Sequence, residues 1–147
     1  MKKTITTAIL AVGLLMGAKA QKSSIYIVDG KAIKGYDPVA FFTESTAVMG
    51  KDSLRYLWQG ASWCFANRTD LERFTSNPEK YAPQYGGYCA YGTAQGHKAP
   101  TQVDTWSVID GKLYFNYNLK IKEAWSKDRA AMIQKADQNW PALKDKE

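Results

Sequence analysis

Short apolar runs separated by turn residues make up most of this 147-residue chain. Asp29-Gly30 and Asp110-Gly111 each stand between two apolar runs, which is the pattern of a β-hairpin with a two-residue turn. A longer link, Gln59-Gly60-Ala61, joins a third pair of runs. The three predicted hairpins comprise residues 25–28 and 31–33, 54–58 and 62–66, and 105–109 and 112–115. The pattern therefore predicts a protein built from several short antiparallel strands.

Residues that cap helices lie between the predicted hairpins. Asp37 precedes Pro38, a residue favoured at the first position of a helix. Asn67 precedes a helical run whose buried side includes Leu71 and Phe74, three residues apart. Together with the hairpins, these helices predict a small single α+β domain in which the helices pack on one side of the strands.

Proline and asparagine mark the remaining boundaries. Asn77-Pro78 ends the second helix and begins a short turn, residues 43–53 are predicted to form a loop, and Asn118 starts a C-terminal helical region. The apolar positions of this region recur at spacings of four and seven: Ile121, Trp125, Met132 and Ala136. The region should end at Asn139-Trp140-Pro141, because proline interrupts a helix.

The N-terminal segment has the three parts of a secretory signal peptide. Met1-Lys2-Lys3 is basic, residues 5–16 are apolar and uncharged, and Ala18-Lys19-Ala20 is an A-x-A cleavage motif. The apolar run is shorter than a membrane-spanning helix requires. The sequence therefore predicts a signal peptide at residues 1–20, cleavage after Ala20, and a periplasmic or secreted protein without a membrane span.

Cleavage at this point changes the net charge. The whole chain has a formal net charge of +6, but three of its lysines lie in the predicted signal peptide, so the mature chain has 17 basic and 14 acidic residues and a net charge of +3. Its basic side chains are scattered among acidic ones, which argues against nucleic acid as a partner. Residues 21–147 suffice for one hydrophobic core, and no repeat or linker divides them. The sequence does not predict an oligomeric state.

Tyrosine and glycine are concentrated in residues 83–92, Pro-Gln-Tyr-Gly-Gly-Tyr-Cys-Ala-Tyr-Gly. Glycine allows a sharp turn, and tyrosine combines apolar area with one hydroxyl group, so the segment suits a packed turn or the wall of a pocket. Six residues form the predicted binding site for a small ligand: Tyr85, Tyr88, Cys89, Tyr91, Tyr114 and Tyr117. The alternative is that these aromatic side chains belong to the core.

Cys89 and His97 are the candidate ligands of a transition metal. With Cys64 they are the only cysteine and histidine residues in the chain, so these types alone allow an open three-ligand site but not a closed zinc shell. Cys64 stands between Trp63 and Phe65 and should face the opposite side of its strand. Other interpretations stay open: a Cys64–Cys89 disulfide closing a loop of about 26 residues, a reactive thiol at Cys89, or a buried Cys89 that only packs.

Three segments carry a family resemblance: Asp37-Pro38-Val39-Ala40, Trp63-Cys64-Phe65 followed by Phe74, and Asn77-Pro78-Glu79-Lys80-Tyr81. In this order and spacing they resemble the YHS-domain family. The thiol positions of the metal-associated members of that family correspond here to Ala40, Ala66 and Asp70. None of the three is a cysteine, and alanine cannot bind a metal. The resemblance therefore implies the scaffold of the family and argues against the metal site of those members.

The second half of the chain extends this resemblance. Residues 87–92, 110–117 and 136–142 are similar to the exported, stand-alone branch of the family, so the resemblance implies a YHS-like domain over residues 21–147. It implies no activity, and the chain contains no catalytic triad, phosphate loop or HExxH motif, which disfavours an enzyme. We expect a binding module for a small ligand or a metal. The alternatives are a thiol-dependent redox protein that uses Cys89, and a structural or partner-docking protein without a ligand.

Overall fold

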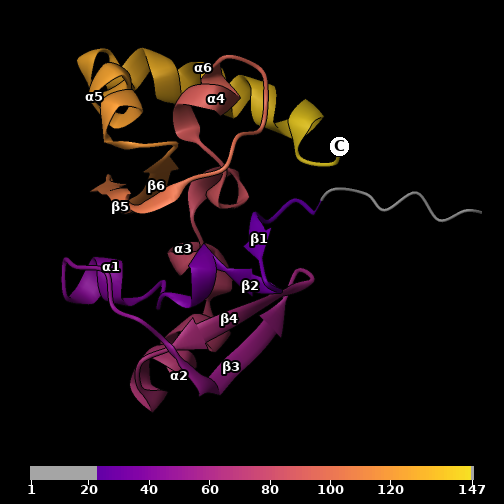
Figure 1. Ribbon diagram of the computed structural model, residues 1–147, viewed down its shortest axis with the longest axis vertical. Helices are drawn as coiled ribbons and strands as arrows, with labels where there is room; N and C mark the ends of the chain where they lie inside the picture. Colours follow the sequence, from indigo (N-terminus) through magenta and orange to yellow (C-terminus); the bar gives the residue numbers. More distant parts are fainter. Residues whose placement is uncertain (1–22, 147) are drawn as a thin grey trace, which may run out of the picture.

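Two β-sheets account for the three predicted hairpins in the computed structural model, which describes residues 23–146 (Figure 1). The predicted signal peptide lies outside this range. The larger sheet has the strand order β1-β2-β4-β3, and its strands are β1 (Ile27–Val28), β2 (Lys31–Ala32), β3 (Lys51–Trp58) and β4 (Ala61–Phe65). The smaller sheet is the hairpin of β5 (Gln102–Ile109) and β6 (Lys112–Asn116).

The predicted antiparallel pairing holds within each hairpin but not between them. β1 pairs with β2, β3 with β4, and β5 with β6, all in antiparallel fashion. The first two hairpins are joined by a parallel contact in which Lys31 of β2 lies opposite Ser62 of β4. This parallel pairing connects segments about thirty residues apart, so hairpin signals in the sequence do not predict it.

Two helices begin at the predicted asparagine caps. Asn67 accepts a hydrogen bond from the N–H three residues on, at 2.8 Å, at the start of α2 (Arg68–Ser76). Asn118 does the same at 2.9 Å at the start of α5 (Leu119–Lys127). Each side-chain oxygen satisfies an N–H group that has no partner inside its helix. These two predictions are therefore confirmed.

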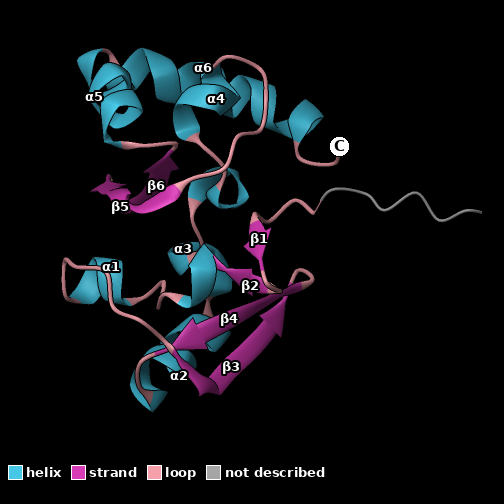
Figure 2. Ribbon diagram, viewed as in Figure 1, coloured by secondary structure: helices cyan, strands magenta, loops and turns pink. Residues whose placement is uncertain are grey.

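The other helices are short, except for the last. They are α1 (Ala40–Thr43), α3 (Pro78–Tyr81), α4 (Ala90–Ala94), α6 (Arg129–Leu143) and the 3-10 turns η1 (Ile33–Gly35) and η2 (Gln84–Gly87). Figure 2 shows α4, α5 and α6 gathered at one end of the molecule beside β5 and β6, with the larger sheet at the opposite end. The fold is thus a small α+β domain, in which α2 packs on β3 and β4 while α4 and α5 pack on β6. None of the helices in residues 23–146 combines the length and apolar character that a membrane crossing requires.

Three predicted boundaries were wrong. The helix expected to start at Pro38 with Asp37 as its cap begins instead at Ala40, and its N-cap residue is Val39, without a side-chain hydrogen bond. The predicted loop at residues 43–53 contains the first residues of β3, because Lys51 pairs with Phe65 of β4. The C-terminal helical region divides at Asp128, and its second helix passes through Pro141 rather than ending there. Trp140 packs against the rings of the tyrosine-rich segment, and this tertiary contact holds the chain helical through the proline.

The core consists of two apolar clusters. In the first, Phe74 of α2 lies against Trp63 and Phe65 of β4, with ring centroids 5.0 and 5.2 Å apart. In the second, Tyr114 of β6 lies against Trp125 of α5 at 5.5 Å, and both side chains are buried. Residues 83–92 enter this second cluster, so packing beneath α5 and α6 positions the tyrosine-rich segment.

Candidate functional site

The tyrosine-rich segment turns sharply before it reaches α4. Tyr85 and Gly86 in η2 both have positive φ angles, 56° and 63°. A Cβ atom at Gly86 would overlap the carbonyl oxygen of Ser24, so this position needs glycine for close backbone approach as well as for its conformation. The predicted packed turn is therefore present, and it delivers the chain to Cys89 at the N-terminus of α4.

Cys89 is held between α4 and the end of β6. Its Sγ atom accepts a hydrogen bond from the N–H of Gly92 at 3.4 Å, and its thiol donates to Oδ1 of Asn116 at 3.6 Å. The N–H of Tyr91 donates to the same Oδ1 atom at 3.1 Å. Because these contacts come from both elements, the sulfur has a defined place in the fold although the side chain is almost fully buried.

A pocket of about 300 Å³ opens beside Cys89. Its lining residues come from α4, the loop after it, the end of β6 and α5: Cys89, Tyr91, Gly92, His97, Ala99, Tyr117 and Ile121. Four of them, Cys89, Tyr91, His97 and Tyr117, are site residues predicted from the sequence. The pocket therefore unites the candidate thiol, the one histidine and two of the candidate tyrosines.

Gly92 allows His97 to approach the helix. The backbone N–H of His97 donates to the carbonyl oxygen of Gly92 at 3.0 Å. A Cβ atom at Gly92 would lie 3.3 Å from Nε2 of His97 and 3.4 Å from Cβ of Ala99, both tight contacts. The missing side chain therefore makes room for the imidazole ring, which lines the pocket.

The remaining predicted tyrosines lie outside this pocket. Tyr85 donates its hydroxyl hydrogen to Asp137 at 2.8 Å, and burial, followed by this carboxylate, raises the pKa of Tyr85. Tyr88 donates to the carbonyl oxygen of Ser23 at 3.0 Å. Tyr114 is buried against Trp125 in the second cluster. These three side chains pack the turn and the core, which is the alternative that the sequence left open.

Both cysteines are free and buried, so the Cys64–Cys89 disulfide is not present. Burial raises the pKa of the Cys64 thiol. Burial also raises the pKa of the Cys89 thiol, although the N–H groups of Gly92, Tyr117 and Tyr91 act in the opposite direction. At neutral pH both residues therefore carry protonated, weakly nucleophilic thiols.

The predicted metal site has too few ligands. Within residues 23–146, no three cysteine, histidine or carboxylate side chains are grouped so that they would hold a metal ion. Cys89 and His97 line one pocket, whereas Cys64 lies in β4. A metal at Cys89 and His97 would have two protein ligands, one fewer than a catalytic zinc site.

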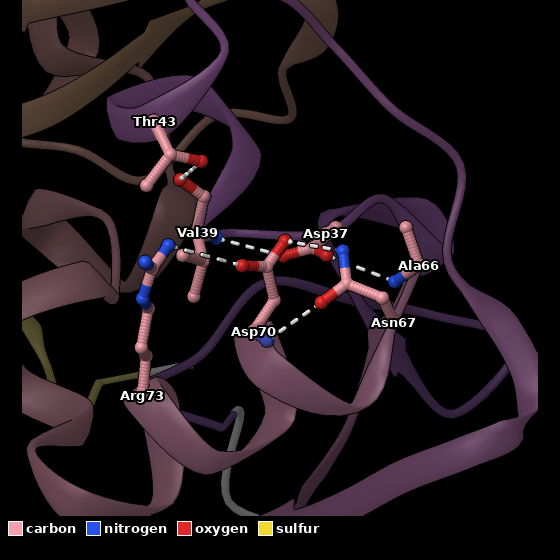
Figure 3. Close-up of polar contacts among 7 residues, drawn as sticks. All are labelled: Asp37, Val39, Thr43, Ala66, Asn67, Asp70 and Arg73. Atoms are coloured by element: carbon pink, nitrogen blue, oxygen red, sulfur yellow. Dashed lines mark hydrogen bonds and ion pairs between the residues drawn. The ribbon is translucent and has the colours of Figure 1, made fainter.

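A buried carboxyl pair forms a second polar cluster, which was not predicted as a site (Figure 3). The two oxygens of Asp37 accept hydrogen bonds from the N–H groups of Val39 and Ala66, both at 2.8 Å. The carboxyl group of Asp70 lies beside that of Asp37, and both residues are buried. Burial raises the pKa of Asp37 to about 6, Asp70 acts in the same direction, and the two N–H groups oppose the shift.

Sequence reasoning also missed Asn116, which lies beneath the pocket floor. Its side chain is fully buried, and within the described part of the chain its Nδ2 atom has no hydrogen-bond partner. The available signal was a polar residue directly after the apolar run 113–115. A buried polar side chain in a small domain is usually retained for a specific contact, which here is with Cys89 and Tyr91.

No family model matches the chain, and searches of curated proteins and of solved structures gave no match either. The resemblance to the YHS-domain family therefore stays a prediction that rests on the motifs. Two of its key positions are neighbours in the fold, because Ala66 and Asp70 both lie at Asp37 (Figure 3).

Proposed function

We propose that this protein is an exported, YHS-like binding module without enzymatic activity, and that it holds a small, mainly apolar ligand in the pocket beside Cys89. One observation carries the proposal: four residues predicted from the sequence as site residues, Cys89, Tyr91, His97 and Tyr117, line one pocket. Two of them reach it from different elements, since Cys89 caps α4 and Tyr117 follows β6.

The pocket has the composition expected of a ligand site. Its volume of about 300 Å³ lies at the lower end of the range for small-molecule pockets. Tyr91 and Tyr117 offer aromatic faces, Ile121 adds apolar area, and His97 supplies one exposed polar group. A flat, ring-shaped molecule with one polar substituent fits these walls better than a highly charged one.

Amide chemical-shift titrations with two probes test the proposal. We expect indole to shift the amide resonances of residues 89–94, 97 and 117–121 in a saturable manner, and cyclohexanol to bind more weakly because it cannot stack on tyrosine. Tyr117→Ala should weaken indole binding at least tenfold. Tyr117 is 49% exposed, so its loss should leave the fold intact.

Tyr26→Ala is the matched control, because Tyr26 is a partly exposed tyrosine beside a different depression. It should bind indole as the wild type does. Absence of saturable shifts with both probes would contradict the proposal and favour a protein that docks a partner without a ligand. Shifts confined to the depression near Tyr26 and Tyr88 would place the ligand elsewhere.

A thiol-dependent redox role for Cys89 is the second candidate. The observation in its favour is that the N–H groups of Gly92, Tyr117 and Tyr91 act on the sulfur against the effect of burial, which raises the thiol pKa overall, so they would stabilise a thiolate there. Treatment of the folded protein with methyl methanethiosulfonate, followed by mass spectrometry, tests it. Rapid modification of Cys89 with Cys64 unmodified would support the redox role, and no modification without denaturant would exclude it.

A further inference from the structure

Asp37 joins two segments that are far apart in the sequence. Its Oδ1 atom accepts from Val39 in the turn that leads into α1, and its Oδ2 atom accepts from Ala66 at the end of β4. The side chain is completely buried. One carboxyl group thus fastens the turn before α1 to the start of α2 (Figure 3).

The charged groups that face Asp37 come from α2. Asp70 lies beside it and is itself hydrogen-bonded to Asn67 Nδ2 at 3.2 Å. Arg73 stands behind Asp70, with Nη1 3.5 Å from Oδ1 of Asp70 and its side chain about half exposed. The turn before α1 and the end of β4 present the N–H groups of Val39 and Ala66 instead of charged side chains.

Two adjacent buried carboxylates cannot both ionise without a cost. Burial penalises each negative charge, and the two charges repel each other at short range. A single shared proton removes one charge and supplies a hydrogen bond between the two groups. The raised pKa of Asp37 has these causes, burial first and Asp70 in addition.

We propose that Asp37 and Asp70 form a proton-operated latch, which holds the turn before α1 closed while the pair shares one proton and loosens the turn when both carboxyl groups are ionised. The direction of the pH dependence follows from the linkage between proton binding and closure of the turn. Because the pKa of Asp37 is higher in the closed state than its ordinary value of 3.8, the contribution to stability is present below pH 3.8 and is lost as the pH rises through about 6.

The latch acts on a segment that packs against the smaller sheet, because α1 lies beside β5 and β6. Phe41 of α1 lies 5.5 Å from Trp106 of β5 and 5.4 Å from Phe115 of β6, measured between ring centroids. Phe115 in turn forms a bridge with Cys89 at the pocket floor. When the turn loosens, Phe41 therefore packs less firmly on Phe115, and the part of β6 that lies beside Cys89 and the pocket is held less firmly.

Hydrogen exchange of the full chain between pH 5 and 7.5 tests the latch. The measured quantities are the protection factors of the Val39 and Ala66 amides, which correct for the intrinsic pH dependence of exchange. With a pKa of about 6 in the closed turn and 3.8 in the open turn, both protection factors should fall about tenfold over this range. Asp70→Asn should show a clearly smaller fall, and Asp37→Asn should show none.

Asp104→Asn, which removes an exposed carboxylate of β5, is the matched control and should behave as the wild type does. Protection factors that do not change with pH in the wild type would overturn the latch, as would an equal fall in Asp70→Asn. If a variant fails to fold, a titration of the side-chain carboxyl carbons of the wild type decides the question. Titration of Asp37 near pH 6 supports the latch, and titration near pH 4 overturns it.

Discussion

The same substitution, glycine to alanine, should strongly destabilise the protein at Gly50 and have little effect on stability at Gly92. Neither residue has a positive φ angle, so alanine is compatible with the backbone at both positions. A Cβ atom at Gly50 would lie 2.6 Å from the carbonyl carbon and from Cβ of Cys64, and 2.8 Å from its carbonyl oxygen. At Gly92 the corresponding contacts with His97 and Ala99 are 3.3 and 3.4 Å.

The size of each stability change depends on whether the neighbouring atoms can move away from the added methyl group. Cys64 belongs to β4 at the centre of the larger sheet, so its backbone cannot move away, and Gly50→Ala should lower the free energy of unfolding by about 3 kcal/mol. Gly92 lies inside α4, where alanine gains about 1 kcal/mol in helix propensity. The loop carrying His97 is exposed and can shift by a few tenths of an ångström, so the net change should stay within about 1 kcal/mol.

Urea unfolding followed by tryptophan fluorescence measures both effects. Gly50→Ala should lower the midpoint by about 1–2 M, whereas Gly92→Ala should leave it nearly unchanged. Gly92→Ala should nevertheless weaken indole binding, because its methyl group occupies the pocket floor beside His97. The packing argument fails if Gly50→Ala is as stable as the wild type, or if the two variants are destabilised equally.

Three further predictions follow from the buried groups. The free energy of unfolding of the wild type should decrease by about 2 kcal/mol from pH 4 to pH 7.5 through Asp37, whose pKa is raised to about 6 from 3.8; urea titrations in matched buffers check this, and a rise over that range would contradict it. Tyr85→Phe should cost about 1–2 kcal/mol in thermal or urea unfolding because Asp137 loses its hydrogen bond; an unchanged midpoint would show that this bond contributes nothing. Phe74→Ala should cost about 3–5 kcal/mol, because its ring contacts Trp63 and Phe65 in the first cluster, and a loss below 1 kcal/mol would contradict that packing.

Much of the fold was predictable because its signals are local. Asp-Gly turns, asparagine caps and an Asn-Pro break act within three or four residues, and each one formed the element that it indicates. The boundary errors at Lys51 and Pro141 arose where distant contacts outweigh local preference. Lys51 joins β3 because Phe65 pairs with it, and Pro141 stays helical while Trp140 packs on the tyrosines.

The candidate site was predictable only in part. The sequence by itself determined which side chains have useful chemistry, namely Cys89, His97 and the tyrosines of residues 83–92, because there are few of them and they are concentrated in one segment. Only the tertiary structure decided which of them meet. It placed Cys89 and His97 at one pocket and left Cys64 outside it.

The same division holds for the two aspartates. The sequence marks Asp37 and Asp70 separately, one before a turn and one in the first turn of a helix. Their proximity depends on β4 bringing Ala66 and the start of α2 against the turn before α1. Burial then sets the proton affinity of Asp37, and burial is a property of the folded chain, because it depends on every element that excludes water from the pair.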